Sequence, residues 1–418
     1  MRFLYTTLLY LLTPMLLLRL LIRGFRNPAY WQRWGERLGL VAQVAGPVDI
    51  WLHAVSVGEV RAALPLLETI MERGLKVLVT TMTPTGSDEV QRQLGDRVQH
   101  CYVPYDFPGA VRRFLQSVQP RVAVIMETEL WPNLLHQCKQ RGVYTVLANV
   151  RISPRSFRGY QRVRGFVAQV LGTINAFAVQ TEVDAQRLRV LGAPGDRMHI
   201  CGNMKFDIDQ PASLVEVAQV LRRDWGQGRV VWVAGSVHEG EDEQVLQSFD
   251  ELKSLHPELL LVIVPRRPER FGTVARLAER GGRVVVQRSQ YAGPLADEVE
   301  VYVGDTMGEL SLFYFAAEIA FVGGSLVAHG GHNILEPCAA GTPVVFGPYM
   351  FNFREISAQA LQCGAGKQVK DQPELTAVID QLLRDPNLRF RMGEAGKKMV
   401  EDNKGAVAKT MALVEQGL

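Results

Sequence analysis

The chain has 418 residues, of which 46 are Lys or Arg, 43 are Asp or Glu, and 47% are hydrophobic. This length allows two or three domains of about 150 residues each. A formal net charge of +3 argues against a nucleic-acid-binding protein with a basic surface. A charged fraction of 21% with this apolar content excludes an intrinsically disordered chain. We therefore expect a globular protein with no nucleic acid among its partners.

The first residues of the chain form an apolar run. Residues 3–18 (FLYTTLLYLLTPMLLL) contain no Asp, Glu, Lys, Arg or His. No small residues of a signal-peptide cleavage site follow them, and the run reaches the roughly 20 residues of a regular membrane span only by including Pro14 and Arg19. We predict an N-terminal membrane anchor over residues 1–26, either a short span or a helix that lies in the interface. A buried core helix is the alternative.

Arginines after this run predict the orientation of the expected anchor in the membrane. Five of them follow between positions 19 and 37, opposed only by Glu36. Positively charged flanks stay in the cytoplasm, so we expect the later domains on that side of the membrane, with membrane lipids as partners. The cysteines agree with a reducing compartment, because they are far apart and lack metal-ligand spacing. They are Cys101, Cys138, Cys201, Cys338 and Cys363.

Short apolar runs alternate with amphipathic segments from position 49 onward. Continuous apolar strands joined by helical crossovers are typical of a parallel sheet that is covered on both faces. The strands expected in the first half are 49–54, 76–80, 122–126, 144–148 and 175–180, and the helices include 59–73, 108–118 and 131–141.

This rhythm stops at a polar segment, GNMKFDIDQPAS (202–213), and then restarts. We therefore predict an α/β fold with two Rossmann-like domains, residues 27–208 and 209–418, and a ligand cleft at the carboxyl ends of their strands. The stretch 391–415 has helical spacing, and we expect the last helix to pack across a domain surface. The strands expected in the second half are 230–234, 259–264, 283–286, 300–303, 319–322 and 343–346.

Acidic residues follow two of the first-half strands. Glu59 in HAVSVGE stands at a helix start after the strand 49–54, either as a cleft-facing acid or as an acid that complements the helix dipole. Glu127 and Glu129 in METELWPN directly follow the strand 122–126, and they share a face if that strand continues. Such acids transfer protons or stabilise a developing cation, although a helix-capping role fits one of them equally well.

Small and hydroxyl residues at strand-to-helix turns are candidate contacts for a phosphate group or for an acceptor substrate. In TTMTPTGSDEV, Thr85, Gly86 and Ser87 stand at a helix start, where backbone N–H groups bind anions. Ordinary helix capping is the alternative there. Ser56 and Gly58 hold similar positions in HAVSVGE.

Four loops follow strands in the second half: GSVHEGE, VPRRPERF, GDTMGEL and FVGGSLVAHGGHNILEP. The last has two glycine pairs, which allow close backbone approach, and a helix start near Asn333, which favours an anion. Glu336 is expected about one turn inside that helix, where it could accept hydrogen bonds from a ribose. The candidate phosphate contacts in these loops are Ser236, His238, Gly324 and Ser325.

A metal site is not expected. Asp207-Ile208-Asp209 has the DxD spacing of metal-dependent sugar transferases, but it lies in the linker with Lys205 beside it. The chain has no GxxxxGK[ST], HExxH or GxSxG motif, which leaves P-loop, zincin and α/β-hydrolase interpretations without support. We predict no metal and no other cofactor.

The ordered motifs of the whole chain resemble those of the 3-deoxy-D-manno-oct-2-ulosonic acid (Kdo) transferases of lipopolysaccharide synthesis. They run from YWQRWGERLG through HAVSVGE, TTMTPTGS, METELWPN, GNMKFD, HEGE, VPRRPERF and GDTMGEL to FVGGSLVAHGGHNILEP. The resemblance implies a GT-B type fold and a glycosyltransferase that moves Kdo from CMP-Kdo to lipid IVA, the lipid A precursor, at the cytoplasmic face of the inner membrane. It also implies an inverting reaction that adds two Kdo residues, a number that the residues themselves leave open.

The same resemblance implies roles for individual residues. Glu59 matches the general base that deprotonates the acceptor glucosamine hydroxyl, and Glu127 and Lys205 match residues that stabilise the transition state. Ile334 replaces a Pro that is usual in the family, and Pro is favoured but not required in a first helical turn. The positions that match CMP-binding segments are Pro265, Arg266, Met307, Gly308, Glu309, Asn333, Ile334, Leu335 and Glu336.

Other functions fit parts of this pattern. The nearest alternative is a different lipid-directed GT-B transferase that uses a UDP-sugar. A nucleotide-sugar epimerase shares this kind of fold, but it needs neither an apolar anchor nor a lipid acceptor. A membrane-tethered binding protein would consume no donor.

Overall fold

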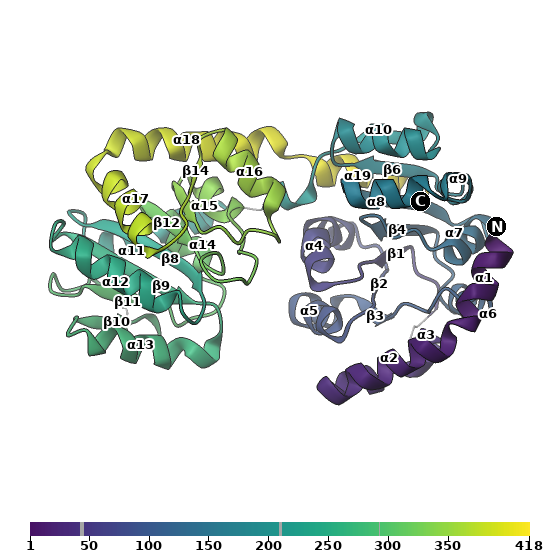
Figure 1. Ribbon diagram of the computed structural model, residues 1–418, viewed down its shortest axis with the longest axis horizontal. Coiled ribbons are helices and arrows are strands. Elements are labelled where there is room, and N and C mark those ends of the chain that lie inside the picture. The colour runs from purple at the N-terminus through teal and green to yellow at the C-terminus, as the bar shows by residue number, and fades with distance from the viewer. Residues whose placement is uncertain (42–45, 209–210, 292) are drawn as a thin grey trace. The chain divides into compact units, whose positions relative to one another are not determined.

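The computed structural model of the protein describes residues 1–41, 46–208, 211–291 and 293–418. They form two compact units, Met1–Asp207 with Asn403–Leu418, and Ile208–Asp402. Within these described residues, each unit is built on a seven-stranded parallel sheet flanked by helices (Figure 1). The predicted α/β class with two Rossmann-like halves is thereby confirmed.

The sheet of the first unit has the strand order β3-β2-β1-β4-β5-β6-β7. The chain runs outward from β1 to β3, returns to the middle and runs outward again from β4, which is the doubly wound order of a Rossmann fold. Trp51 packs in the apolar cluster on one face, whereas Ile50 and Leu52 pack in the cluster on the other. The strands are β1 (Ile50–His53), β2 (Val77–Thr81), β3 (Gln99–Tyr102), β4 (Val122–Met126), β5 (Tyr144–Val150), β6 (Ala176–Val179) and β7 (Met198–Ile200).

Helices cover both faces of this sheet. Buried residues of α6, α7, α9 and α10 pack on one face, and buried residues of α4, α5 and the C-terminal helix α19 pack on the other. The helices that pack on the sheet bury an apolar stripe at helical spacing, as Val111, Phe114 and Val118 do in α6. The helices are α3 (Trp34–Arg37), α4 (Val57–Glu72), α5 (Pro84–Leu94), α6 (Pro108–Val118), α7 (Pro132–Gln140), α8 (Pro154–Gln161), α9 (Arg164–Leu171) and α10 (Glu182–Leu191).

The N-terminal apolar run forms two helices, α1 (Arg2–Leu11) and α2 (Thr13–Arg26). In the described part of the chain, no single helix is long and apolar enough to cross a membrane, and α1 passes that test only jointly with residues 13–25, at a bend of 49°. One side of α1 lies against the first unit (Figure 1): Thr6 Oγ1 donates to Asn133 Oδ1 at 3.1 Å, and the rings of Tyr10 and Phe107 are 5.0 Å apart. Phe3 on this helix remains 85% exposed.

The sheet of the second unit has the order β10-β11-β9-β8-β12-β13-β14, with the first strand of the unit again in the middle. The strands are β8 (Val230–Val237), β9 (Leu259–Pro265), β10 (Val285–Gln287), β11 (Val301–Val303), β12 (Ile319–Val322), β13 (Val344–Phe346) and β14 (Gly366–Gln368). The helices are α11 (Ala212–Asp224), α12 (Asp242–Lys253), α13 (Phe271–Arg280), α14 (Leu310–Phe315), α15 (Leu335–Ala340), α16 (Arg354–Gln362), α17 (Gln372–Arg384) and α18 (Pro386–Asn403).

The end of the chain returns to the first unit. The expected helical stretch 391–415 is divided between α18 and α19 (Ala406–Glu415), because Gly405 adopts a φ of +94°. Asp207 accepts the N–H groups of Gly405 and Val407 at 2.6 Å each and so caps α19. Residues 403–418 group with the first unit, and buried residues of α19 contribute to its core, as expected for a last helix that packs across from the second domain.

Candidate active site

The strand order of the first sheet reverses between β1 and β4. In doubly wound sheets, ligands bind beyond the carboxyl ends of the strands at this switch point, because the loops there diverge. The loop after β1 leads to Glu59, and Glu127 directly follows β4. The two predicted acids therefore flank the switch point of the first unit.

Glu59 lies in the first turn of α4 and is only 8% exposed. Its carboxylate accepts the N–H of Val55 at 2.8 Å and the hydroxyl of Ser56, the N-cap residue, at 3.1 Å. Burial raises the pKa of Glu59 to about 7, with further contributions from the negative charges of Glu127 and Glu129. The local hydrogen bonds at the helix start do not prevent a role for Glu59 as an acid or base, and its raised pKa suits a general base near neutral pH.

The two acids after β4 do not continue that strand, so the condition for a shared strand face is not met. Glu127 has a φ of +55°, a left-handed conformation that non-glycine residues rarely adopt. Glu129 accepts the indole N–H of Trp131 at 2.7 Å, and its pKa is raised by burial and by the charge of Glu127. Backbone strain of this kind is concentrated at functional sites.

Lys205 stands in a short 3-10 turn, Met204–Phe206, which packs against α4. Two asparagines hold this turn: Asn203 accepts the N–H of Lys205 at 3.0 Å, and Asn149 Oδ1 accepts the N–H of Met204 at 3.1 Å. Asn149 lies at the end of β5, next to β4, and is 1% exposed with a φ of +55°. The turn that carries Lys205 is thereby fixed to the strand beside Glu127.

Sequence reasoning missed Asn149. Its position as a polar residue near the end of the buried run of β5 is the only signal in the sequence, because neither its left-handed backbone nor its partner 55 residues further on can be read from local spacing. The side-chain N–H₂ of Asn149 is buried without a hydrogen-bond partner in the described part of the chain. A buried unpaired donor is costly, so a specific role is expected at this position.

The candidate phosphate contacts at the first-unit turns are engaged by their own helices. Thr83 caps α5 and accepts the N–H of Gly86 at 3.1 Å, and Ser87 accepts a hydrogen bond from Arg33 at 3.2 Å. Thr85 donates to Thr83 at 3.4 Å. Helix capping by Thr83 is thus present at this turn, and the phosphate role of Thr85, Gly86 and Ser87 stays a prediction. Ser56 and Gly58 stand in the equivalent turn before Glu59.

The switch point of the second sheet lies between β8 and β12. The glycine loop after β12 was expected to present its N–H groups to an outside anion. Instead, the N–H groups of Gly324, Ser325 and Leu326 donate to the buried carboxylate of Glu241 at 2.6–2.8 Å. The hydroxyl of Ser325 donates to Val322 O. Gly324 and Ser325 thus support the loop through an internal anion, and they are no longer assigned to a phosphate.

Glu241 was also missed by the sequence analysis, although it lies in the HEGE motif. Its carboxylate accepts a fourth N–H group, from His238 at 3.0 Å. Ser236, just before, has a φ of +56°, and the pairing of β8 with β9 shifts register between Gly235 and Val237. Bulges beside sites re-aim the following side chain, which here is His238.

The predicted CMP-binding positions follow neighbouring strands. Pro265 ends β9, and Arg266 donates its N–H to Val237 O at 3.0 Å. After β11, Met307 is 56% exposed, Gly308 has a φ of +86°, and Glu309 pairs with Arg288 at 2.8 Å, which lowers the pKa of Glu309.

The segment Asn333–Glu336 also belongs to the predicted CMP-binding positions, and it lies in the loop after β12 and the start of α15. Asn333 Oδ1 accepts the N–H of Leu335 at 3.1 Å, and Glu336 accepts hydrogen bonds from Asn333 at 3.1 Å and from Ser311 of α14 at 2.9 Å. Ile334 and Leu335 are fully buried. Helix α15 begins at Leu335, so Glu336 lies in its first turn, nearer the start than expected.

No metal cluster accompanies these residues. In the part of the chain that the structure describes, no group of three or more His, Cys, Asp and Glu side chains could hold a metal ion. Of the DxD-like triplet, Asp207 caps α19, and Asp209 lies outside the described residues.

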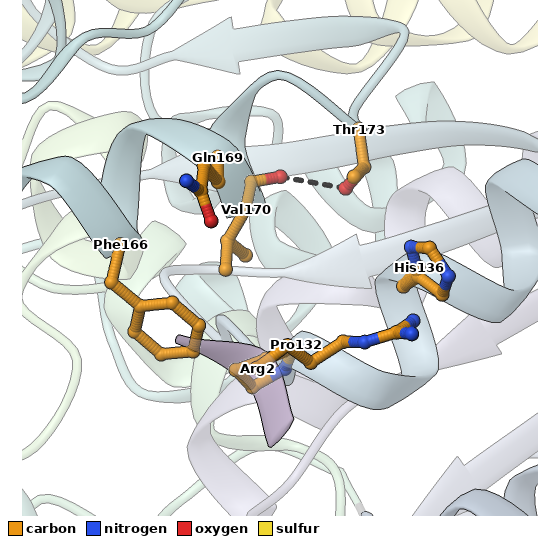
Figure 2. A pocket seen from close by; sticks show the side chains of 7 residues that line it. All are labelled: Arg2, Pro132, His136, Phe166, Gln169, Val170 and Thr173. Carbon is orange, nitrogen blue, oxygen red and sulfur yellow. Dashed lines mark hydrogen bonds between the residues drawn. The ribbon is translucent and has the colours of Figure 1, made fainter. Parts of the chain in front are cut away.

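A hollow of about 220 Å³ lies in the first unit beside α1 (Figure 2). Figure 2 shows the side chain of Arg2 extending toward His136 on α7, and Phe166 and Val170 of α9 standing opposite. None of the residues predicted for the site lines it. The lining residues are Arg2, Pro132, His136, Phe166, Gln169, Val170 and Thr173.

Comparisons with known proteins agree with this arrangement. Residues 32–208 match the family model for 3-deoxy-D-manno-octulosonic-acid transferase (kdotransferase), and residues 229–399 match that for glycosyl transferases group 1. A UDP-GlcNAc 2-epimerase from Neisseria meningitidis has a similar fold, with a TM-score of 0.56 at 13% identity over 88% of this chain and 100% of its own. The two sheets and the matched domains define a glycosyltransferase of the GT-B type.

Two curated relatives show to which family of GT-B glycosyltransferases the chain belongs. A 3-deoxy-D-manno-octulosonic acid transferase from Haemophilus influenzae is 39% identical over 99% of this chain and 98% of its own length. Another from Bordetella pertussis is 35% identical over 99% of both chains. The chain therefore belongs to the 3-deoxy-D-manno-octulosonic acid (Kdo) transferase family. Its activity is Kdo transfer, and the epimerase and binding-protein interpretations are set aside.

Proposed function

We propose that the protein transfers Kdo from CMP-Kdo to lipid IVA with inversion at the anomeric carbon, without a metal ion or other cofactor, and that it adds two Kdo residues. The observation that carries this proposal is the pair of acids at the first switch point. Glu59 is buried with a pKa of about 7, and the charge of Glu127 acts on it.

In this mechanism, Glu59 takes the proton of the acceptor hydroxyl as that oxygen attacks the anomeric carbon. The new carbon–oxygen bond forms while the bond from the anomeric carbon to the CMP phosphate breaks, and CMP leaves with the bonding electrons. A pKa near the working pH allows the carboxylate both to exist unprotonated and to accept the proton.

The remaining groups act on the charges that develop. Glu127 stabilises the oxocarbenium-like centre, and the ammonium group of Lys205 offsets the negative charge of the departing phosphate or of the Kdo carboxylate. Arg266, Met307–Glu309 and Asn333–Glu336 hold the cytidine and its phosphate. The convergence of these segments at the ends of β9, β11 and β12 supports this assignment.

The α1–α2 pair is proposed to hold the enzyme on the cytoplasmic face of the inner membrane as an interfacial element. Polar contacts attach one side of α1 to the first unit, and Phe3, Leu4 and Leu11 are 71–85% exposed on α1. Exposed apolar residues followed by arginines suit an interface with anionic head groups. This favours the interfacial form of the predicted anchor over a span.

Incubation of the full chain with CMP-Kdo and lipid IVA, followed by mass spectrometry of the lipid, tests the reaction and the number of sugars added. Two Kdo additions and inhibition by CMP but not by UDP are expected. Inhibition by UDP alone would favour the UDP-sugar alternative. Addition of a single Kdo would contradict the proposed number of Kdo residues.

The membrane role has its own test. The double substitution Phe3→Glu and Leu11→Glu changes exposed side chains while leaving the contacts of Thr6 and Tyr10 in place. We expect weaker binding to anionic vesicles and slower transfer to lipid, with CMP affinity unchanged. The exposed Val183→Glu on α10 is the control. Unchanged vesicle binding of the double variant would contradict the interfacial assignment.

A further inference from the structure

Three histidines lie together at the carboxyl ends of β8 and β12, with His238 stacked on His329 and bonded through its ring edge to His332. The ring of His238 lies 4.1 Å from that of His329, at 22° between planes, and 5.1 Å from that of His332, at 4°. The Nε2 atoms of His238 and His332 are 2.8 Å apart. At this distance one ring donates an N–H and the other accepts it, so the two rings form a hydrogen-bonded imidazole pair.

The backbone fixes this stack. The strained Ser236 and the register shift after Gly235 aim His238, and its own N–H is held by Glu241. A Cβ atom at Gly324 would lie 3.0 Å from the ring of His332, so glycine leaves the room that this ring occupies. The stack is therefore built by the loops of the second switch point.

Positive charge surrounds the pair. Burial first, and then the charges of His329, Arg267, Arg266 and Arg270, lower the pKa of His238 to about 4. The acids on the neighbouring elements have partners already. Glu241 accepts four backbone N–H groups, and Arg270 pairs with Asp242 and Glu239. The His238 imidazole is thus neutral at pH 7 and stands in an environment that attracts an anion.

We propose that His238, His329 and His332 form a proton-linked receptor for the phosphate of the donor nucleotide, so that the imidazole pair takes up one proton from solvent when the phosphate binds. The identity of the donor rests on the proposed function, whereas the receptor itself rests on this geometry. When His238 is the donating ring, it can accept that proton at Nδ1 while its Nε2–H bond to His332 persists, and it becomes an imidazolium.

The direction of the pH dependence follows. The bound phosphate raises the pKa of the pair above its value in the free protein, so protons are taken up on binding. Affinity for a phosphate therefore increases as the pH falls toward the pKa of the free pair, and the dependence disappears above the pKa of the complex.

Isothermal titration calorimetry of the full chain, in buffers with different ionisation enthalpies at about pH 6.5, measures this proton uptake directly. The probes are CMP and cytidine. We expect the unmodified protein to take up more protons with CMP than His238→Gln or His332→Gln, and these variants to bind CMP roughly tenfold more weakly because a charge-assisted contact is lost. Cytidine, which lacks the phosphate, should show no difference between variants.

His199→Gln, at an exposed position of β7, is the matched control and should behave as the unmodified protein. Titration of the phosphate of CMP itself contributes equally to every variant and cancels in the comparison. Equal proton uptake by all variants, each folded by circular dichroism, would overturn the proposal. Failure of the unmodified protein to bind CMP would instead count against the donor assignment. Inorganic phosphate then serves as the probe, and absence of histidine-dependent proton uptake with it would overturn the receptor as well.

Discussion

The first strand of each unit leads into the same kind of turn, and the two units use it differently. β1 is followed by Ser56-Val57-Gly58-Glu59 and β8 by His238-Glu239-Gly240-Glu241, so a buried glutamate follows a glycine beside each switch point. Glu241 accepts four backbone N–H groups, whereas Glu59 accepts one N–H and one hydroxyl. The number of backbone donors, rather than burial, distinguishes a carboxylate that holds loops in place from one that has acceptor capacity left for a substrate.

The surroundings of the two glutamates reinforce this contrast. Glu59 has two acidic neighbours, which make its ionisation harder. The turn of Glu241 is surrounded by histidines and arginines, which attract a second anion. One switch point is therefore suited to removing a proton from an acceptor, and the other to holding a negatively charged donor.

The strongest test of the comparison removes the acid of the first switch point. Glu59→Gln keeps the shape and one acceptor but cannot take a proton, so transfer should fall by roughly a hundred- to ten-thousandfold, while CMP affinity stays unchanged. Initial rates with saturating donor and lipid acceptor measure the effect. Glu68→Gln, on the same helix but exposed and paired with Arg97, is the control. Undiminished transfer by folded Glu59→Gln would remove the base assignment.

The corresponding change in the second unit should act on stability. Glu241→Gln places an N–H₂ group against backbone N–H donors, so the free energy of unfolding should fall by about 2–4 kcal/mol, with weaker CMP binding. Urea denaturation measures the first effect, and calorimetry measures the second. The exposed Glu243→Gln on the same helix should change the stability little. A stable Glu241→Gln variant with normal CMP affinity would contradict the internal-anion role.

Within the first unit, Asn149 is expected to have both a structural role and a role in positioning a site residue. Asn149→Gly tolerates the φ of +55° but removes the acceptor that holds the turn of Lys205. We expect kcat to fall roughly ten- to a hundredfold because a positioning contact is lost, with the KM for the donor little changed.

Asn175→Ala is the matched control for Asn149, because Asn175 makes the same kind of side-chain bond, to the N–H of Thr145 at the other end of β5. Both variants should lose about 1 kcal/mol of stability, but only Asn149→Gly should lose activity. Equal kcat values for the two variants would show that Asn149 serves the fold alone.

Most of the fold could be predicted from the sequence, and the exceptions have a common cause. The central strands are continuous apolar runs, so their pattern is visible without any partner. β3, β7 and β14 were missed because they are short strands at the sheet edges, with polar residues such as Gln99, His199 and Gln368. Their pairing depends on the neighbouring strand rather than on their own composition.

The residues of the candidate site also divide into those that could be predicted from local sequence and those that could not. Glu59 and Glu127 could be predicted because strand ends and helix starts are local features. Asn149 and Glu241 could not, because their roles depend on left-handed backbone or on partners more than 50 residues away. The same limit explains Gly324 and Ser325: their N–H groups do bind an anion, but that anion is a glutamate of this chain.

The smallest expected effect tests whether neighbouring acids tune the base. Because the base must be deprotonated, transfer should rise with pH through about 7, the pKa of Glu59.

The Glu129→Gln variant removes one negative neighbour of Glu59, while the carbonyl of the new side chain can still accept the indole N–H of Trp131. The pKa of Glu59 should then fall, and the acid limb of the kcat profile should move to lower pH by less than about one unit. Glu182→Gln, 56% exposed on α10, should leave the profile unchanged. A limb that does not move would mean that burial alone sets the pKa of Glu59, and a limb that moves to higher pH would contradict the contribution of the Glu129 charge.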